Sequence, residues 1–376
     1  MKEKRLNPGL ITFPIVEAGN IPLSNLAAIL YSIFGKLYVI TGNEGRLLFK
    51  RQNDEISIFK IRHKARTNLI ARAVNYTFTQ LRIAFVLLKL MKDVDAWIFF
   101  IGGEGLTLPM ITAKLLRKDV IIVSAGSGLK DNKIFKDPLV GMLTVLYNIS
   151  YHLSDRIILY SNVLIEEQGL QKYKQKIHIA HHHFIDFDKF RMRTQLNDRD
   201  NSVGYIGRLS EEKGILNFVK AIPDILKEGN EVNFLIGGDG LLRNEIERDL
   251  NERNLNGKVK LAGWISHDNL PRYLNELKLI VLPSYTEGLP NIMLEAMACG
   301  TPVLATPVGA IPNFIKDGET GFIMENNSPE CIAKNVIRAL NHPNLEQISK
   351  KAHDMVEKEF TYEKAVNRYR EIFNKL

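Results

Sequence analysis

Short apolar runs alternate with longer segments of helical periodicity along this chain of 376 residues. In the first half the apolar runs are LITFPIV, KLYVITG, ISIFKI, AWIFFIG, VIIVSAG, SDRIILYSN and IHIAHHHF. In the second half they are NSVGYIG, VNFLIGG, VKLAG, LIVLPS and PVLAT, and helical patterns follow them. Buried strands that alternate with helices are typical of parallel, doubly wound sheets. The pattern therefore predicts an α/β protein.

The same alternation occurs twice, and the length suits two domains of ordinary size. The polar stretch at residues 191–202 is typical of a linker. We expect a first Rossmann-like domain over residues 1–190 and a second over residues 203–360, with parallel sheets facing across a cleft. Residues 361–376 have the pattern of an amphipathic helix.

Positive charge is concentrated in the first half. The chain carries +8, but residues 1–190 carry +10 and the rest −2. Between Arg46 and Lys92 there are 11 basic residues against two acidic ones. Such a segment favours an anionic partner: lipid head groups, a lipid-linked phosphate acceptor or nucleic acid. Its apolar residues could insert into a membrane; they are Leu81, Ile83, Phe85 and Leu87–Leu88. The alternative is a core helix pair with a solvated charged face.

Two cysteines, Cys299 and Cys331, exclude a disulfide framework and a cysteine-based zinc site. Cys299 lies among small residues, where we expect a buried thiol. No run of 18 uncharged apolar residues occurs, and the apolar run near the start is too short for a signal peptide. These features predict a cytoplasmic protein, attached peripherally at the inner face of the cell membrane through its basic segment.

The segment PSYTEGLPNIMLEAMACGTPVLAT carries two glutamates, Glu287 and Glu295, separated by a turn and the start of a helix. A turn that opens a helix exposes backbone N–H groups, and these favour an anion such as a diphosphate. The carboxylates can accept hydrogen bonds from sugar hydroxyls. The segment could therefore grip both ends of a nucleotide sugar, unless it is an ordinary strand–turn–helix unit with surface glutamates.

A second segment, GYIGRLSEEKG, also has the pattern of a strand, a glycine turn and a helix. Gly207 would let the backbone approach a ligand closely. Arg208 and Lys213 place two cations beside the turn, which suits a diphosphate leaving group. The alternative is a loop with solvated charges.

With FLIGGDG, LAGWIS and VGAIPNFIKDGETGF between or after these segments, the chain resembles a retaining glycosyltransferase of the GT-B fold. The resemblance is to glycosyltransferase family four, the glycosyl transferases group 1 with the E-x7-E motif, and covers nearly all of residues 201–376. It implies a last helix that returns to the first domain. It also implies a nucleoside-diphosphate sugar, UDP-linked, as co-substrate, with no metal or other cofactor.

The resemblance assigns roles to the donor site. It places Glu295 at the ribose hydroxyls and Glu287 at the donor sugar. It gives Arg208 and Lys213 the departing diphosphate, where electrostatic stabilisation is usually the largest catalytic contribution. The backbone of the turn would meet the sugar and phosphate; its residues are Gly288, Leu289, Pro290 and Asn291.

Two further positions follow from the resemblance. Ile265, after Trp264, would read the nucleobase through its backbone, although Trp264 could equally be a partly buried core aromatic. Gly19 would let the chain approach the donor phosphates, although the longer Gly-Gly loop of relatives is Glu17-Ala18-Gly19-Asn20 here.

The chain departs from the family after its fifth strand. Many members carry a His-Asp pair there that faces the transferred sugar, and this chain has Ala125 and Gly126. The polar residues left nearby are Glu104, Ser124 and Ser127, which we treat as candidate sugar or acceptor contacts. Catalysis does not require the missing pair, because in a front-face retaining mechanism the departing phosphate oxygen can serve as the base.

The run His181 to His183 has the composition of a metal site. Adjacent histidines in or next to a strand point to opposite faces, which argues against a shared metal.

These observations predict a hexosyltransferase acting on a glycan or lipid-linked acceptor at the cytoplasmic membrane face. One alternative is a GT-B nucleotide-sugar epimerase or hydrolase. Another is a non-catalytic basic module that binds nucleic acid, which would need stacking aromatics among its basic residues. The aromatics there, such as Phe78 and Phe85, lie in an apolar context, so we expect no nucleic acid partner.

Overall fold

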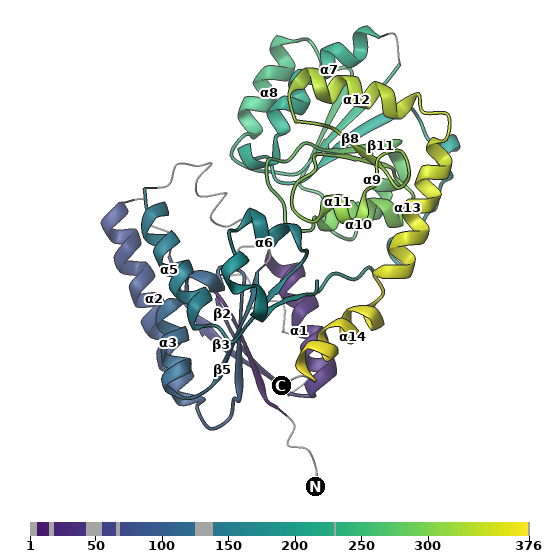
Figure 1. The fold of residues 1–376 in the computed structure, drawn as a ribbon. Coiled ribbons are helices and arrows are strands. Elements are labelled where there is room, and N and C mark those ends of the chain that lie inside the picture. The colour runs from purple at the N-terminus through teal and green to yellow at the C-terminus, as the bar shows by residue number, and fades with distance from the viewer. Residues whose placement is uncertain are drawn as a thin grey trace. The chain divides into compact units, whose positions relative to one another are not determined.

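The computed structural model describes residues 6–14, 19–42, 55–64, 68–124, 138–228 and 231–374. The chain divides into two compact units, shown as a ribbon in Figure 1. Unit 1 consists of Met1–Phe184 and Tyr362–Leu376, and unit 2 of Ile185–Thr361. Unit 1 thus contains the final helix of the chain, the segment expected to complete the first domain.

In the part of the chain that the structure describes, unit 1 is built on a seven-stranded parallel sheet of order β3-β2-β1-β4-β5-β6-β7. Its central strands are buried along their whole length, which explains why they are continuous apolar runs. Gly9 is required where it stands, because a Cβ there would lie 2.2 Å from the ring of Trp97 on the neighbouring strand. The strands are β1 (Pro8–Thr12), β2 (Leu37–Gly42), β3 (Ile56–Ile61), β4 (Ala96–Phe100), β5 (Asp119–Ser124), β6 (Arg156–Leu159) and β7 (Ile177–Ile179).

Three helices of unit 1, α2, α3 and α5, pack side by side (Figure 1). On another part of the unit, α14 packs on α1: the rings of Phe34 and Phe373 lie 5.2 Å apart, and Tyr362 Oη donates to Ala28 O at 3.1 Å. Among the described residues, the helices of unit 1 are α1 (Asn20–Phe34), α2 (Leu69–Lys89), η3 (Gly103–Gly105), α3 (Thr107–Leu115), α5 (Val140–Leu153), α6 (Val163–Glu167), η4 (Gln171–Lys176) and α14 (Tyr362–Phe373).

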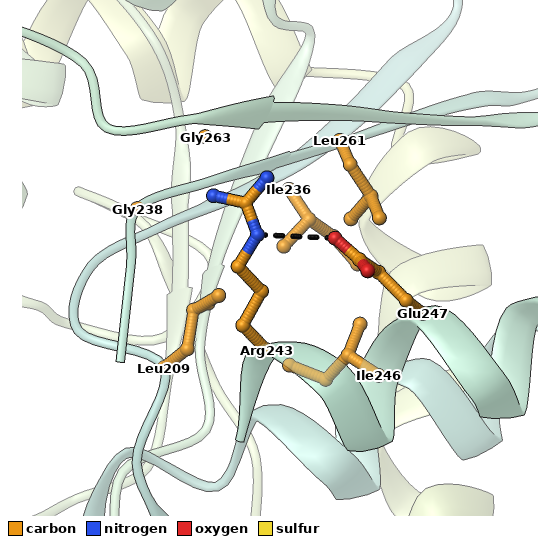
Figure 2. A pocket seen from close by; sticks show the side chains of 8 residues that line it. All are labelled: Leu209, Ile236, Gly238, Arg243, Ile246, Glu247, Leu261 and Gly263. Atoms are coloured by element: carbon orange, nitrogen blue, oxygen red, sulfur yellow. Dashed lines mark hydrogen bonds and ion pairs between the residues drawn. The ribbon is translucent and has the colours of Figure 1, made fainter. Parts of the chain in front are cut away.

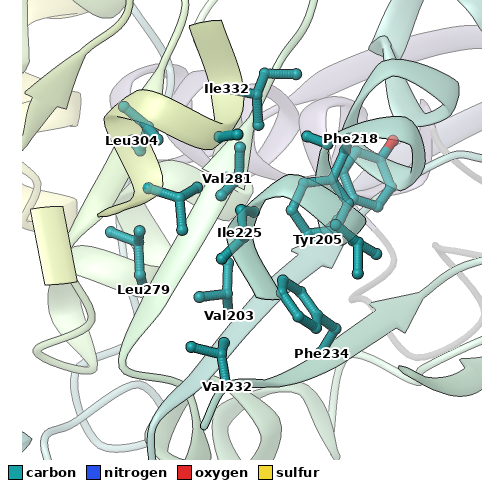
Figure 3. Close-up of a cluster of buried hydrophobic side chains, with 14 of the residues drawn as sticks. Val203, Tyr205, Phe218, Ile225, Val232, Phe234, Leu279, Val281, Leu304 and Ile332 are labelled. Atoms are coloured by element: carbon teal, nitrogen blue, oxygen red, sulfur yellow. The ribbon is translucent and has the colours of Figure 1, made fainter. Parts of the chain in front are cut away.

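Unit 2 contains a six-stranded parallel sheet of order β10-β9-β8-β11-β12-β13. Tyr205, Phe218 and Phe234 pack together in its core, with ring centroids 6.2 to 6.3 Å apart (Figure 3). Five strands are those the apolar runs predict; β13 is a two-residue strand, too short to leave a pattern. The strands are β8 (Ser202–Ile206), β9 (Asn233–Gly237), β10 (Val259–Gly263), β11 (Leu279–Leu282), β12 (Val303–Ala305) and β13 (Phe322–Ile323).

The helices of unit 2 cover its sheet and leave the carboxyl ends of the strands to loops. They are η5 (Leu196–Asp198), η6 (Glu211–Lys213), α7 (Ile215–Lys227), α8 (Arg243–Glu252), α9 (Leu270–Glu276), α10 (Asn291–Ala298), α11 (Ile311–Phe314), α12 (Pro329–Leu340) and α13 (Leu345–Glu359).

The stretch 191–202, expected as a linker, is instead part of unit 2. The reason is Arg199, whose guanidinium is buried and donates to Leu277 O at 2.9 Å and Cys299 O at 2.7 Å. Leu196 is buried as well. Residues 191–202 are therefore anchored in the core of unit 2, although their composition is polar.

Candidate active site in unit 2

Two loops at the carboxyl edge of the unit 2 sheet are joined. One follows β8, the other follows β11, and Tyr285 N donates to Glu212 O at 2.9 Å between them. Gly214 has φ +66°, and a Cβ there would lie 2.0 Å from Pro283 O. Only glycine combines that backbone conformation with so close an approach. The two segments singled out from the sequence are therefore parts of one site.

Lys213 and Glu287 meet at the centre of this site. Lys213 Nζ donates to Glu287 Oε1 at 2.6 Å, and Ser284 Oγ donates to the same oxygen at 2.8 Å. Glu287 is buried. Thr306 Oγ1 donates a hydrogen bond to Ser284 O at 2.6 Å. The Glu287 carboxylate can accept hydrogen bonds from a ligand, and the Lys213 ammonium beside it can bind an anionic group.

The turn after Glu287 leads into α10. Ala310 N donates to Gly288 O at 2.7 Å, and Leu289 is buried. Pro290 is the N-cap residue of α10, which begins at Asn291. The first amides of this helix lack intrahelical acceptors, and its dipole favours negative charge at this end.

Arg208 lies beside this site with an exposed guanidinium, which is 3.4 Å from Glu212 Oε1. Ser210 Oγ donates to the same carboxylate oxygen at 2.6 Å. Gly207 N donates to Gly237 O at 3.0 Å. These contacts fix the backbone around Arg208 and leave its cation accessible.

The GGDG segment, Gly237 to Gly240, makes turns. Gly238 has φ +129°, and a Cβ there would lie 1.8 Å from Gly207 O. A Cβ on Gly240 would lie 2.3 Å from Leu209 O. The segment is therefore built from glycines so that it can lie against the Gly207 loop.

Glu295 lies on α10, buried, and accepts a hydrogen bond from His267 Nε2 at 2.8 Å. His267 Nδ1 is 3.0 Å from Lys189 Nζ.

Ile265 is half-buried and lies against Gly237. A Cβ added to Gly237 would lie 2.4 Å from Ile265 Cδ1. Trp264 is 62% exposed, so the alternative that it is a core aromatic is wrong. The strand ends before it, and its side chain faces solvent.

A small pocket lies at the carboxyl ends of β9 and β10, against α8 (Figure 2). Across it, Arg243 Nε is 3.0 Å from Glu247 Oε1. Gly238 and Gly263 form part of its wall, and Leu209 reaches it from the loop after β8. The pocket therefore lies close in the chain to Gly207, through Leu209, and to Ile265, through Gly263.

The remaining candidates belong to unit 1. Gly19 is the N-cap residue of α1. Glu104 is buried in η3 after β4, and Ser124 is buried at the end of β5. Burial raises the pKa of Glu104 above its ordinary value, while hydrogen bonds to backbone and Ser124 lower it. Ala125, Gly126 and Ser127 lie outside the described residues, as do Glu17 and Ala18.

The adjacent histidines His181, His182 and His183 are all buried, and two of them contradict the expectation of opposite faces. The rings of His182 and His183 stack at 4.6 Å. They follow the end of β7 at Ile179, so strand alternation does not apply to them. Tyr160 Oη is 3.0 Å from His182 Nδ1. Burial lowers the pKa of His181 and His182 well below the ordinary value, which keeps both rings neutral.

The basic segment of the sequence forms β3 and α2 where the structure describes it. The expected insertion set is partly wrong, because Ile83 and Leu87 are buried in the core of unit 1. Exposed apolar residues instead line α2 at steps of three or four; they are Ile70, Val74, Phe78, Leu81, Phe85 and Leu88. Among the described residues, no helix has the length and apolar character needed to cross a bilayer. Arg46, Lys50, Arg51 and Arg66 lie outside the described residues.

Three site residues were missed from the sequence: Ser284, Glu212 and His267. Ser284 and Glu212 lie inside the two motifs, but their side chains bond within the protein, and only the structure shows this. His267 left a signal, because a titratable side chain three residues after Trp264 follows directly on a predicted strand end. Cys299 is buried as predicted, and burial raises the pKa of its thiol to about 12.

The chain is similar in sequence to known proteins. Residues 186–359 match the family described as Glycosyl transferases group 1. The alpha-D-kanosaminyltransferase of Streptomyces kanamyceticus is 31% identical over 175 residues, which cover 45% of each chain. The amylovoran biosynthesis glycosyltransferase AmsK of Erwinia amylovora is 26% identical over 333 residues, 78% of this chain and 81% of AmsK. The chain spans about half the length of the curated relatives it matches at about 30% identity.

The whole chain also resembles solved structures. Anabaena Alr3699/HepE, crystallised in complex with UDP, superposes with a TM-score of 0.77 at 15% identity. The match covers 98% of this chain and 100% of HepE. At this identity the likeness shows the fold.

Proposed function

We propose that this chain, whose residues 186–359 match the glycosyl transferases group 1 and which has the GT-B fold, is a retaining hexosyltransferase. The donor would be a UDP-sugar and the acceptor a glycan or a lipid-linked glycan. The observation that carries the proposal is the convergence of Lys213, Glu287 and Arg208 on one loop pair, with Glu295 on the following helix.

The geometry of unit 2 supports a nucleotide-sugar donor. Lys213 and Arg208 supply positive charge beside the first turn of α10, and together they suit a diphosphate. Glu295 would accept hydrogen bonds from the ribose, and Glu287 from the sugar. HepE has been crystallised with UDP and with UDP-glucose, which favours a uridine nucleotide here.

The proposed reaction breaks the bond from the anomeric carbon to the diphosphate and forms a bond to the acceptor oxygen on the same face. The proton of the acceptor hydroxyl moves to the departing phosphate oxygen. Lys213, Arg208 and the helix end would stabilise the charge that develops on the diphosphate. No protein base and no metal is needed in this scheme, since cations of the chain do that work.

The acceptor side would involve unit 1 and a membrane surface. Glu104 and Ser124 lie at the carboxyl edge of its sheet, where ligands of open α/β sheets bind. The exposed apolar line on α2, with Arg82 and Lys89 beside it, suits the cytoplasmic face of an anionic membrane. A lipid-linked acceptor would be presented there.

The test is a donor screen with the purified full-length protein. UDP-, GDP- and ADP-sugars are each incubated with a membrane lipid extract, and nucleotide release and glycosylated lipid are both measured. We expect UDP release coupled to a new glycolipid, with unchanged activity in EDTA. The product should keep the anomeric configuration of the donor, which NMR of the linkage would report.

Other products would contradict the proposal. An isomerised sugar or free sugar without glycolipid would show the epimerase or hydrolase alternative. A gel shift with nucleic acid, sensitive to salt, in the absence of any donor turnover would show the binding-module alternative.

A further inference from the structure

We infer that His267 is a positioning residue for Glu295, and that Lys189 fixes the tautomer in which it acts. The inference rests on the proposed function, because it concerns the carboxylate that would hold the donor ribose. All three residues belong to unit 2. Lys189 lies in the turn that begins the unit, His267 follows β10, and Glu295 lies on α10.

The hydrogen-bond chemistry permits one arrangement. A lysine ammonium can only donate, so Lys189 Nζ at 3.0 Å makes His267 Nδ1 an acceptor. The ring proton is then on Nε2, which donates to Glu295 Oε1 at 2.8 Å. The chain Lys189 to His267 to Glu295 is therefore a directed relay that ends on a buried carboxylate.

Two neighbouring residues of one turn, Lys189 and Phe190, contact the His267 ring. Asp186 Oδ1 accepts from Lys189 N at 3.2 Å, and Asp186 O accepts from Phe190 N at 2.8 Å. This turn puts the Phe190 ring 5.0 Å from the His267 ring. Asp268 Oδ1 accepts a hydrogen bond from Lys189 Nζ at 2.7 Å, so the lysine ammonium is paired with a carboxylate. The turn before the first strand of unit 2 thus presents both an aromatic ring and an ammonium to His267.

The consequence is an oriented carboxylate. Within the part of the chain that the structure describes, the side chain of Glu295 is hydrogen-bonded through Oε1, so Oε2 can accept from a ribose hydroxyl. A carboxylate whose second oxygen is already fixed loses less freedom when it binds a ligand. Second partners of this kind set tautomer and orientation at many binding sites.

The experiment uses the full-length protein and measures the affinity for UDP by calorimetry. His267→Phe keeps an aromatic ring against Phe190 and removes the donor at Nε2. His267→Gln can place an amide N–H near the Nε2 position. We expect about tenfold weaker UDP binding in His267→Phe and binding within about threefold of wild type in His267→Gln, in proportion to one hydrogen bond to a charged group. The matched control is His152→Phe, an exposed histidine of α5 in unit 1, which should bind UDP as wild type does.

A double-mutant cycle separates positioning from general damage. If His267 acts through Glu295, His267→Phe should add little to the loss already caused by Glu295→Gln. Lys189→Met should weaken UDP binding a few-fold in the wild-type background and not in the Glu295→Gln background. Histidine ¹⁵N shifts should show a protonated Nε2 in the wild type and a tautomer mixture in Lys189→Met.

The outcomes distinguish this inference from the function it rests on. Wild-type affinity in His267→Phe, or losses that add fully with Glu295→Gln, would overturn the relay while leaving the donor site intact. A wild-type protein that binds no uridine nucleotide would overturn the proposed donor and the relay with it. Circular dichroism of each variant shows that a loss of binding is not a loss of folding.

Discussion

At the scale of residues, the cations of the site differ in their surroundings. Lys213 contacts a buried carboxylate, whereas the Arg208 guanidinium is 56% exposed and meets Glu212 only at 3.4 Å. The two should therefore share a catalytic role but differ in their contribution to folding. Removal of Lys213 leaves Glu287 with a buried charge held by Ser284.

We predict that Lys213→Ala and Arg208→Ala each slow sugar transfer by about 10²-fold or more, because each removes preorganised charge from the leaving group. Lys213→Ala should also destabilise unit 2 by roughly 1–3 kcal/mol, the cost of an unpaired buried group, and Arg208→Ala should not. Transfer rates and urea unfolding measure the two effects. Lys227→Ala, an exposed pair with Asp224, is the control. Parental turnover in either variant would contradict the role.

The two glutamates are predicted to act on different steps. Glu295→Gln keeps the size of the side chain and removes its charge. It should weaken donor binding by roughly 1.5–3 kcal/mol, because a hydrogen bond to a charged acceptor is lost. Glu287→Gln should mainly lower turnover, since Glu287 would face the transferred sugar. Calorimetry with UDP and steady-state rates separate the effects. Two variants that transfer sugar as the wild type does would show that the donor lies elsewhere.

The burial of Glu104 predicts that the stability of unit 1 depends on pH. Burial raises its pKa in the folded chain above the ordinary value, which the unfolded chain has. Between those two pKa values the folded chain binds more protons, so stability falls as pH rises through this window. A neutral glutamine has no such dependence. Glu104→Gln should therefore gain stability relative to wild type as the pH rises from about 4 to about 8.

Urea unfolding across that pH range measures the difference, with the exposed Glu166→Gln as a control that should follow the wild type. A Glu104→Gln variant that is less stable by the same amount at every pH would mean that Glu104 is a satisfied carboxylate.

At the scale of elements, the strands are predictable because both of their faces are buried, which makes them continuous apolar runs. The joined loops are predictable in part, because Gly214 and Gly238 mark positions that need glycine. The anchoring of residues 191–202 is not, since the partners of Arg199 are distant backbone carbonyls. The relay through His267 is hidden because its partners, Lys189 and Glu295, are side chains distant from it in the sequence.

Helix α2 carries the prediction on membranes. Its apolar line is between 48% and 74% exposed at Ile70, Val74, Phe78, Leu81, Phe85 and Leu88. Each basic residue near an anionic bilayer contributes about 1 kcal/mol, and salt screens this over roughly 8–10 Å. Replacing Phe78, Leu81 and Phe85 by Gln should reduce sedimentation with anionic liposomes at low salt and spare UDP binding by unit 2.

The matched control is Leu241→Gln, which removes a leucine that is 98% exposed in unit 2. High salt should release the wild-type protein from anionic liposomes, and neutral liposomes should bind it less. Binding that ignores lipid charge would contradict the membrane role. The membrane role would also be contradicted if the triple variant still binds liposomes but loses a self-association that gel filtration detects in the wild type. The apolar line of α2 would then be an interface between two copies of the chain.

At the scale of the whole molecule, the chain leaves unit 1 at residue 184, forms unit 2 without interruption and returns to unit 1 at residue 362. Apolar runs predict which segments are strands, but not the order β3-β2-β1-β4-β5-β6-β7, which depends on how each crossover packs. The proposed donor contacts lie in unit 2, apart from Gly19. Ligand and mutation should therefore act on the two units separately.

A pair of buried phenylalanines tests this separation. Phe373 packs on Phe34 in unit 1, and Phe360 packs on Phe314 in unit 2, with ring centroids 5.2 and 5.0 Å apart. Phe→Ala in a core costs about 3–5 kcal/mol. Phe373→Ala should lower the melting transition of unit 1, and Phe360→Ala that of unit 2. A chain of two units need not unfold in one step, so calorimetry can resolve both transitions.

UDP then assigns the transitions, because a ligand stabilises only the unit that binds it. At one hundred times its dissociation constant, UDP should add about 2.7 kcal/mol to the unit that binds it. It should restore most of the loss in Phe360→Ala and little of the loss in Phe373→Ala. Equal protection of both variants would mean that the units unfold together. Protection of Phe373→Ala alone would place the nucleotide in unit 1, against the proposed donor contacts of unit 2.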